Sequence, residues 1–143
     1  MVKPYEVNQS TVRIARFTSW MARLGIGRTQ VLTTTGRKTG QPRQLPVSPI
    51  ETEGVEYIVS PYGEVGWVRN VRANPEVTLR HGTKHRVARL HEMTGLAAAV
   101  VVASYHGREA YARRYMDVPD NASLDDFVKA GDRFPVFRVD SAE

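Results

Sequence analysis

The chain contains no cysteine. This absence excludes a disulfide framework, zinc or iron–sulfur sites bound by thiolates, and a cysteine nucleophile. Long apolar runs are missing too, because the longest one, Leu96 to Ala103, is far too short to span a bilayer. The first ten residues lack the apolar centre of a signal peptide. We therefore expect a cytoplasmic protein whose chemistry uses groups other than thiolates.

The length and composition are those of an ordinary globular domain. With 143 residues, 41% apolar and 24% charged, the chain can bury one substantial core, and we expect a single domain over residues 1–143. Lys and Arg number 20 against 15 Asp and Glu, which gives a net charge of +5. A positive balance favours anionic partners, but it does not choose among phosphates, nucleic acid and a lipid surface.

The N-terminal segment has the pattern of an amphipathic helix. Apolar residues recur at helical spacing, at Ile14, Phe17, Met21 and Leu24, while the arginines lie mostly on other faces. We expect a helix over residues 9–25, ended by the glycines that follow. Such a helix could also lie on the inner face of a membrane as a peripheral contact.

Beyond residue 27 the pattern is one of short strands with inserted helices. Strands are predicted at 31–35, 43–50, 55–60, 77–80, 85–92 and 135–139. Pro46 and Pro49 put the second of these at a sheet edge or beside a bulge. Helices are predicted at 66–73, at 96–114 with a break at Gly107, and at 124–130 with Ser123 as N-cap. Antiparallel strands with helical insertions favour an α+β barrel over a parallel α/β sheet.

The densest chemical signal is the turn in Thr33-Thr-Thr-Gly-Arg-Lys-Thr-Gly-Gln-Pro-Arg43. Two glycines free the backbone, hydroxyls flank the tip, and Arg37 and Lys38 supply a cationic fork and a mobile point charge. These features predict an anion-binding turn. The spacing of its glycines does not match a Walker loop. The alternative is a solvated hairpin tip whose glycines serve the turn and whose charges aid solubility.

The histidines and paired aspartates do not indicate a metal or acid–base site. His81, His85, His91 and His106 show no ligand spacing, so we expect them to be surface or strand residues. Asp125 and Asp126 are adjacent and would point apart on a helix. We expect both in the first turn of a helix, where negative charge is favourable.

Three motifs resemble the deazaflavin-dependent nitroreductase family. They are Thr34 to Arg43, the segment Ser60-Pro-Tyr-Gly-Glu-Val-Gly-Trp-Val-Arg-Asn-Val-Arg-Ala-Asn-Pro75, and the closing Phe134-Pro-Val-Phe-Arg138. The likeness runs from about Val31 to Val139. It implies a split β-barrel of about six or seven mostly antiparallel strands. It also implies an oxidoreductase that passes the hydride of reduced coenzyme F420 to a quinone, enone, nitro compound or similar small acceptor.

The resemblance assigns site residues one by one. It places the coenzyme's phosphate and oligoglutamate tail at the cationic turn, and its ring along the following strand, between two further segments. The implied coenzyme-binding residues are Arg37, Lys38, Thr39, Arg43, Gln44, Leu45, Pro46, Val47, Ser48, Ser60, Pro61, Tyr62, Gly63, Gly66, Trp67, Val68, Arg69 and Asn70. One departure matters, because several nitroreductases have Ser-Lys-Gly-Gly where this chain has Ser60-Pro-Tyr-Gly63, so a cationic contact is missing there.

Two aromatic residues carry specific expectations. Tyr115 is the preferred match to a tyrosine that the family often places near the acceptor, and it is the implied proton donor, with water as the alternative. Tyr105 and Tyr111 lie in the same helical region. Trp67 and Asn70 are three residues apart on one helical face, which would let an indole pack on the ring while an amide bonds a polar group. A buried structural tryptophan is the plain alternative.

Several readings stay open beside this one. A flavin mononucleotide (FMN) reductase of the same barrel type would also use a phosphate-binding turn, and a non-catalytic carrier of a lipid-like ligand would use the apolar pocket. A nucleic-acid binder is disfavoured, because the aromatic and basic residues are not interleaved. No metal is expected. Related barrels commonly dimerise, so a homodimer is an alternative to a monomer.

Overall fold

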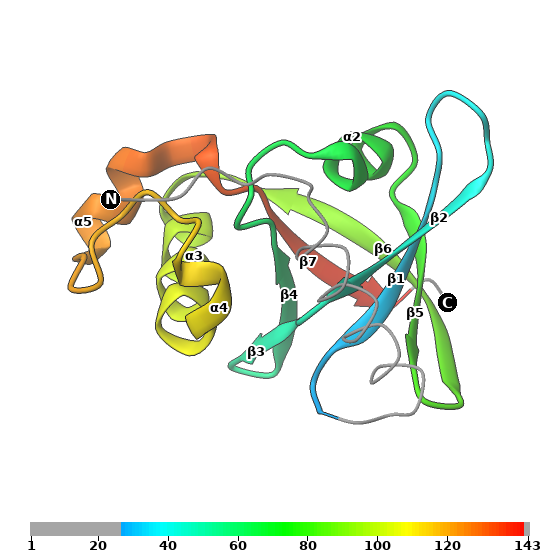
Figure 1. Cartoon of the computed structure of the whole chain (residues 1–143), viewed down its shortest axis with the longest axis horizontal. Helices are drawn as coiled ribbons and strands as arrows, with labels where there is room; N and C mark the ends of the chain where they lie inside the picture. The colour runs from blue at the N-terminus through cyan, green and yellow to red at the C-terminus, as the bar shows by residue number, and fades with distance from the viewer. Residues whose placement is uncertain (1–26, 142–143) are drawn as a thin grey trace.

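The computed structural model describes residues 27–141, which form one sheet of seven strands. The strands are β1 (Gln30–Thr35), β2 (Pro42–Val47), β3 (Ile50–Thr52), β4 (Val55–Val59), β5 (Glu76–His81), β6 (Lys84–Met93) and β7 (Val136–Ser141). Their order is β2-β1-β5-β6-β7-β4-β3, and every pair is antiparallel. The sheet curls into the half-barrel of Figure 1, so the predicted α+β split β-barrel is confirmed. The predicted helix at 9–25 lies outside the described residues.

Both faces of the sheet are buried. Successive side chains along a strand contribute alternately to the two cores on these faces. Val59 on β4 pairs with Val136 on β7, and both belong to a core that the later helices cover. The next pair, Ile58 and Phe137, belongs to the core inside the barrel. Because successive side chains of a strand point to opposite faces, two adjacent residue pairs serve two cores.

The helices divide between these two cores. The helix α2 (Gly66–Ala73), which the sequence predicts with the same bounds, buries Val68 and Val71 inside the barrel. The helices α3 (Gly95–Arg108), α4 (Ala110–Arg113) and α5 (Leu124–Ala130) pack on the other face. Figure 1 shows these three grouped at one end of the molecule, while the β1–β2 turn extends at the other end. The helix α5 begins at Ser123, whose side chain forms a capping box with Asp126.

Two predicted elements need correction. The single strand expected at 43–50 is two strands, because the chain leaves the sheet at Ser48 and Pro49, and β3 then pairs with β4 across a tight turn. Glu53 and Gly54 both have positive φ in that turn. The long helix expected at 96–114 is interrupted at Glu109 rather than at Gly107. The edge position predicted from the prolines is confirmed, because β2 is an outermost strand.

His106 is also placed differently from the expectation. It is only 4% exposed, on α3, and its ring packs edge-on against Phe127 of α5 at a centroid distance of 5.3 Å. The prediction of a surface or strand histidine is therefore wrong for His106. His81, His85 and His91 do lie in strands, as expected. The sequence of α3 contains no local pattern that would have predicted the burial of His106.

Candidate functional site

The cationic turn between β1 and β2 is closed by its own backbone. The Gly36 N–H donates to the Gln41 carbonyl and the Gly40 N–H donates to the Gly36 carbonyl, each at 2.8 Å. Gly40 has φ +72°, a conformation that favours glycine, and a Cβ at Gly36 would come within 3.0 Å of the Gln41 carbonyl oxygen. The turn therefore requires both glycines, and it holds Lys38 at an exposed tip.

Asn70 of α2 fastens this turn to the barrel. Its Oδ1 accepts from the backbone N–H of Arg37 at 3.2 Å and from the Arg37 guanidinium at 2.8 Å, and its Nδ2 donates to the Thr34 hydroxyl at 3.3 Å. The Arg37 guanidinium also donates to the Gly66 carbonyl at 3.4 Å. Two of the predicted coenzyme-binding segments therefore meet through a side chain that is only 6% exposed.

The strand β2 follows the turn as a sheet edge. An edge strand presents one row of backbone groups that no further strand pairs, which suits the predicted contact with the polar edge of a planar ring. Its predicted residues change from exposed at Arg43 and Gln44 to half-buried from Leu45 onward, through Pro46 and Val47 to Ser48. The side chains of Lys38 and Arg43 are exposed and make no hydrogen bond or ion pair within the described part of the chain. Thr39 serves the turn, because its hydroxyl accepts from the Gln41 N–H at 3.2 Å.

The loop Ser60 to Gly63 joins the predicted coenzyme site to the predicted proton donor. Ser60 is fully buried, with its N–H donating to the Pro135 carbonyl at 2.9 Å and its hydroxyl donating to the Gly63 carbonyl at 2.6 Å. This rigid base carries Tyr62, whose ring lies edge-on to Tyr115 at a centroid distance of 5.3 Å and an angle of 78°. The structure thus brings Tyr115 to the loop that the sequence assigns to the coenzyme.

The predicted residues of α2 include both buried and exposed side chains. Trp67 is 9% exposed and packs on Phe137 in the barrel core at 5.5 Å, whereas Arg69 is exposed. Val68 is fully buried, so its side chain belongs to the core rather than to a ligand surface. The first turn of α2 contains no acidic residue, and no side chain caps its start at Gly66. A ring contact by Trp67 stays a prediction beside its structural role.

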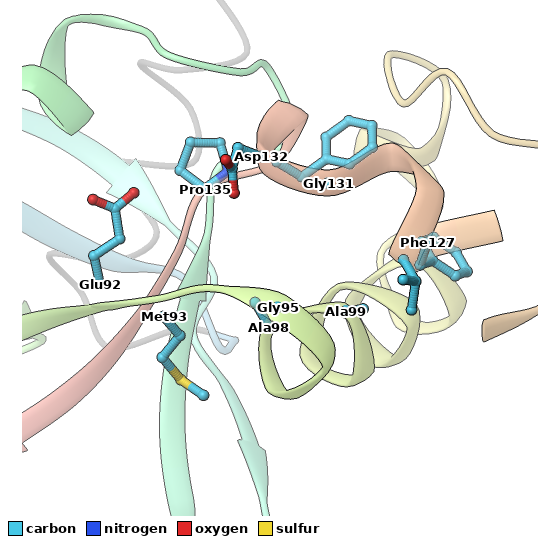
Figure 2. A pocket seen from close by; sticks show the side chains of 11 residues that line it. Glu92, Met93, Gly95, Ala98, Ala99, Phe127, Gly131, Asp132 and Pro135 are labelled. Atoms are coloured by element: carbon cyan, nitrogen blue, oxygen red, sulfur yellow. The ribbon is translucent and has the colours of Figure 1, made fainter. Parts of the chain in front are cut away.

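Neither cavity described in the molecule is lined by a predicted coenzyme-binding residue. The one in Figure 2 lies between α3, α5 and β6, has a volume of about 50 Å³, and has room for only a few water molecules. The other is a cleft of about 1090 Å³ at the opposite end of the barrel from the cationic turn. The predicted coenzyme-binding residues therefore lie outside both cavities, on the turn, the edge strand, α2 and the loop at Ser60 to Gly63.

The family of the chain is decided by a match over most of its length. The family model described as F420H(2)-dependent quinone reductase matches residues 12–117. The chain belongs to this family. Membership in the F420H(2)-dependent quinone reductase family confirms the predicted deazaflavin family and the prediction of an F420-dependent reductase. It does not determine the acceptor.

Solved structures similar to this quinone reductase family member support the same fold. An F420-H2 dependent reductase is 25% identical, with 79% of this chain and 94% of that chain covered and a TM-score of 0.51. A protein of unknown function from Agrobacterium tumefaciens is 18% identical with a TM-score of 0.60, and this chain spans 58% of its length and is covered over 100%. An FAD-binding protein from Mesorhizobium loti is 18% identical over 85% of this chain and 86% of that chain, with a TM-score of 0.53. Among curated protein sequences, none matches.

Sequence reasoning also missed the ion pair of Arg28 and Glu109 at the base of the β1–β2 hairpin. They form an ion pair at 3.1 Å although 81 positions separate them, and no local pattern marks such a pair. Among residues 27–141, no three His, Asp or Glu side chains gather closely enough to hold a metal ion. No helix in that range has the length and apolar character needed to cross a membrane.

Proposed function

We propose that this chain passes the hydride of reduced coenzyme F420 to a quinone. The proposal assigns the coenzyme's anionic groups to the turn at Arg37 to Arg43 and its ring to β2 and the loop at Ser60 to Gly63. The acceptor would lie against Tyr62 and Tyr115. One observation carries the proposal: the Arg37–Asn70 contact joins two coenzyme-binding segments, predicted separately, into one cationic corner.

The residues at this corner fit an anionic, planar coenzyme. Arg37 is oriented by Asn70 and by the Gly66 carbonyl, so one cation is fixed beside the uncapped start of α2. Lys38 and Arg43 supply two further exposed positive charges on the same hairpin. A fixed guanidinium, mobile cations and a helix amino-terminus together favour phosphate and carboxylate groups. These cations would hold the oligoglutamate tail without a lysine in the loop at Ser60 to Gly63.

The chain's part in the reaction is to bind, orient and exclude water. Reduced F420 supplies the hydride when it is bound. A quinone that accepts a hydride is left with an anionic oxygen, which must take up a proton. The phenol of Tyr115, held edge-on by Tyr62, would donate that proton and then recover one from water. Tyr62 would act as the wall that keeps the donor in place.

Replacement of Tyr115 tests the assignment of the donor. A general acid typically contributes about a hundredfold or more, and water can replace a phenol in part, so Tyr115→Phe should lower kcat for quinone reduction by roughly ten- to a hundredfold. Coenzyme affinity should stay within about twofold of the parent, because the hydroxyl is not assigned to coenzyme binding. The assay follows coenzyme oxidation by absorbance with a water-soluble benzoquinone.

The half-buried Tyr57 on β4 lies outside the proposed site, and Tyr57→Phe is the matched control. A Tyr115→Phe enzyme as fast as the parent would remove Tyr115 from the mechanism and leave water as the donor. If the parent reduces no quinone with F420 but turns over with reduced FMN, the flavin alternative replaces the proposal. Ligand binding without turnover would favour the lipid-carrier alternative.

A further inference from the structure

A third tyrosine, Tyr105, lies within electrostatic reach of Tyr62. Tyr105 on α3 is 7% exposed and belongs to the core that also holds Met116 and Phe127. Burial raises the pKa of Tyr105 well above its ordinary value, and the charges of Glu109 and Tyr62 raise it further. Tyr105 therefore stays a neutral phenol and is unsuited to donate a proton. Tyr62 and Tyr115 are half-buried, and we call them together with Tyr105 the tyrosine wall.

Glu109 lies one helical turn after Tyr105, at the junction of α3 and α4. Its N–H donates to the Tyr105 carbonyl at 2.9 Å, and its carboxylate pairs with the Arg28 guanidinium at 3.1 Å. The Glu109 side chain is only 19% exposed, and burial raises the pKa of Glu109, while Arg28 lowers it. The Arg28 side chain is 64% exposed, so the pair joins a solvated guanidinium to a largely buried carboxylate.

Arg28 lies at the base of the β1–β2 hairpin, at the end of β1 away from the cationic turn. It lies just before β1, the strand that leads to the cationic turn. The hydroxyl of the next residue, Thr29, is 3.4 Å from the hydroxyl of Ser48, a predicted coenzyme contact at the end of β2. The Arg28–Glu109 pair therefore joins the base of the β1–β2 hairpin to the helices that carry the tyrosines.

Two further arginines bond at the α3–α4 junction. One bonds to the barrel and the other to the end of α3. Arg108 donates to the Glu51 carbonyl in β3 at 2.9 Å. Arg113 donates to the carbonyl of His106 at 2.9 Å and to the carbonyl of Gly107 at 3.2 Å, which satisfies the end of α3. These hydrogen bonds hold the α3–α4 junction in place, and the Arg28–Glu109 ion pair connects the junction to the β1–β2 hairpin.

We propose that Arg28 and Glu109 are positioning residues that set the spacing between the coenzyme hairpin and the tyrosine wall, and thereby the fit of the quinone. This inference rests on the proposed function. Neither residue is assigned a contact with coenzyme or acceptor. Displacement of a reacting group by about 1 Å can cost up to a hundredfold in rate, so a small shift of the wall that carries the donor Tyr115 is enough to slow quinone reduction.

The experiment compares Arg28→Ala, Glu109→Gln, the double variant and the charge exchange Arg28→Glu with Glu109→Arg, all in the full chain. Each single change should lower kcat/KM for a water-soluble benzoquinone about tenfold, with F420 affinity within about twofold of the parent. The double variant should be no worse than either single one, because both remove the same pair. The charge exchange should recover part of the loss.

Asp125→Asn is the matched control, because it breaks the exposed Lys129–Asp125 pair on α5 and should change none of these quantities. A parental kcat/KM in the single variants would overturn the proposal. A shared loss of kcat/KM, F420 affinity and melting temperature would also overturn it, because that pattern indicates general destabilisation.

A readout without coenzyme separates this inference from the proposed function. The near-ultraviolet circular dichroism of the tyrosines should change in Arg28→Ala and Glu109→Gln and return in the charge exchange. If the parent fails to bind F420, the proposed function falls, and these spectra still decide whether the pair positions the tyrosine wall. Spectra equal to the parent's would reject the positioning role.

Discussion

Arg37 and Lys38 are neighbours at the tip of one turn, yet their side chains have different surroundings. The Arg37 guanidinium bonds to Asn70 and to the Gly66 carbonyl, whereas Lys38 extends into solvent. The sequence predicts that both residues bind the coenzyme's tail and contribute little to folding. The contacts of Arg37 revise that prediction, because its removal deletes hydrogen bonds that fix the turn. Lys38 is therefore the cleaner probe of binding.

Lys38→Ala should weaken F420 binding without changing stability. A hydrogen bond to a charged group contributes about 1.5–3 kcal/mol, so the dissociation constant should rise roughly ten- to a hundredfold. An exposed substitution of this kind usually changes the free energy of unfolding by no more than about 0.5 kcal/mol. Added salt should weaken the parent's binding more than the variant's, because part of the attraction is screened. Fluorescence titration and thermal melting measure the two effects.

Lys84→Ala removes an equal charge at the β5–β6 turn, which lies at the other end of β1 from the cationic turn. It should bind F420 almost as the parent does. If the parent, Lys38→Ala and Lys84→Ala bind F420 with equal affinity and the same salt dependence, the cationic turn is a solvated hairpin tip without a role in binding.

Asn70 is the residue on which the geometry of the cationic corner depends. Asn70→Ala removes the acceptor for Arg37 and the donor to Thr34, so we expect a loss of about 1–3 kcal/mol in the free energy of unfolding together with weaker coenzyme binding. Asn70→Asp keeps the acceptor for Arg37 but adds a negative charge beside the site. Its stability should exceed that of Asn70→Ala while its F420 affinity is lower still. Denaturant unfolding and titration test this order, and the reverse order of affinities would separate Asn70 from the coenzyme.

At the scale of elements, α3 contains a buried group that limits its stability in acid. Burial, and secondarily Arg113, lower the pKa of His106, whereas Asp120 raises it, and among the described residues its Nε2 has no hydrogen-bond partner. The unfolded chain binds a proton near the ordinary histidine pKa of 6.5, while the folded chain resists it. Stability is therefore fully present above that pH and falls as the pH drops toward the lower folded pKa.

His106→Gln should flatten this acid dependence between about pH 7.5 and 5.5, the range in which an ordinary histidine titrates. His85→Gln, at an exposed position on β6, should keep it. The comparison uses denaturant unfolding of the parent and both variants across that range. A slope that persists in His106→Gln would assign the acid sensitivity to another group.

The elements that the sequence predicted well are those with local signals. Ser123 and Asp126 occupy the two positions of a capping box, and α5 begins where that pattern indicates. Likewise, Asn74 and Pro75 end α2 where the pattern places its end. The separation of β2 from β3 was not predicted, because it depends on pairing with β4, a strand that only the fold brings alongside.

In the candidate site, too, the features with local sequence signals were predicted and those that depend on the fold were not. The motif around Gly36 and Gly40 predicted the cationic turn, because its chemistry is contained within a few consecutive residues. The burial of Trp67 against Phe137, 70 positions away, required the closed barrel. The Arg28–Glu109 pair likewise joins segments that are neighbours only after folding. The assignment of coenzyme-binding residues stays a prediction until binding is measured.

For the whole molecule, the central claim is that a curled antiparallel sheet presents one cationic corner and one tyrosine wall to a deazaflavin. The net charge of +5 agrees with an anionic coenzyme, but it would suit FMN as well. Membership in the F420H(2)-dependent quinone reductase family favours the deazaflavin, whereas a likeness to an FAD-binding protein at 18% identity bears on the fold alone.

The most direct test of this claim is a fluorescence titration of the purified chain with oxidised F420 beside FMN, under the same buffer and salt. The three cations of the β1–β2 hairpin can engage the oligoglutamate tail, which FMN lacks. We therefore expect F420 to bind at least about tenfold more tightly, the equivalent of one such contact at about 1.4 kcal/mol. Equal or tighter binding of FMN would contradict the account.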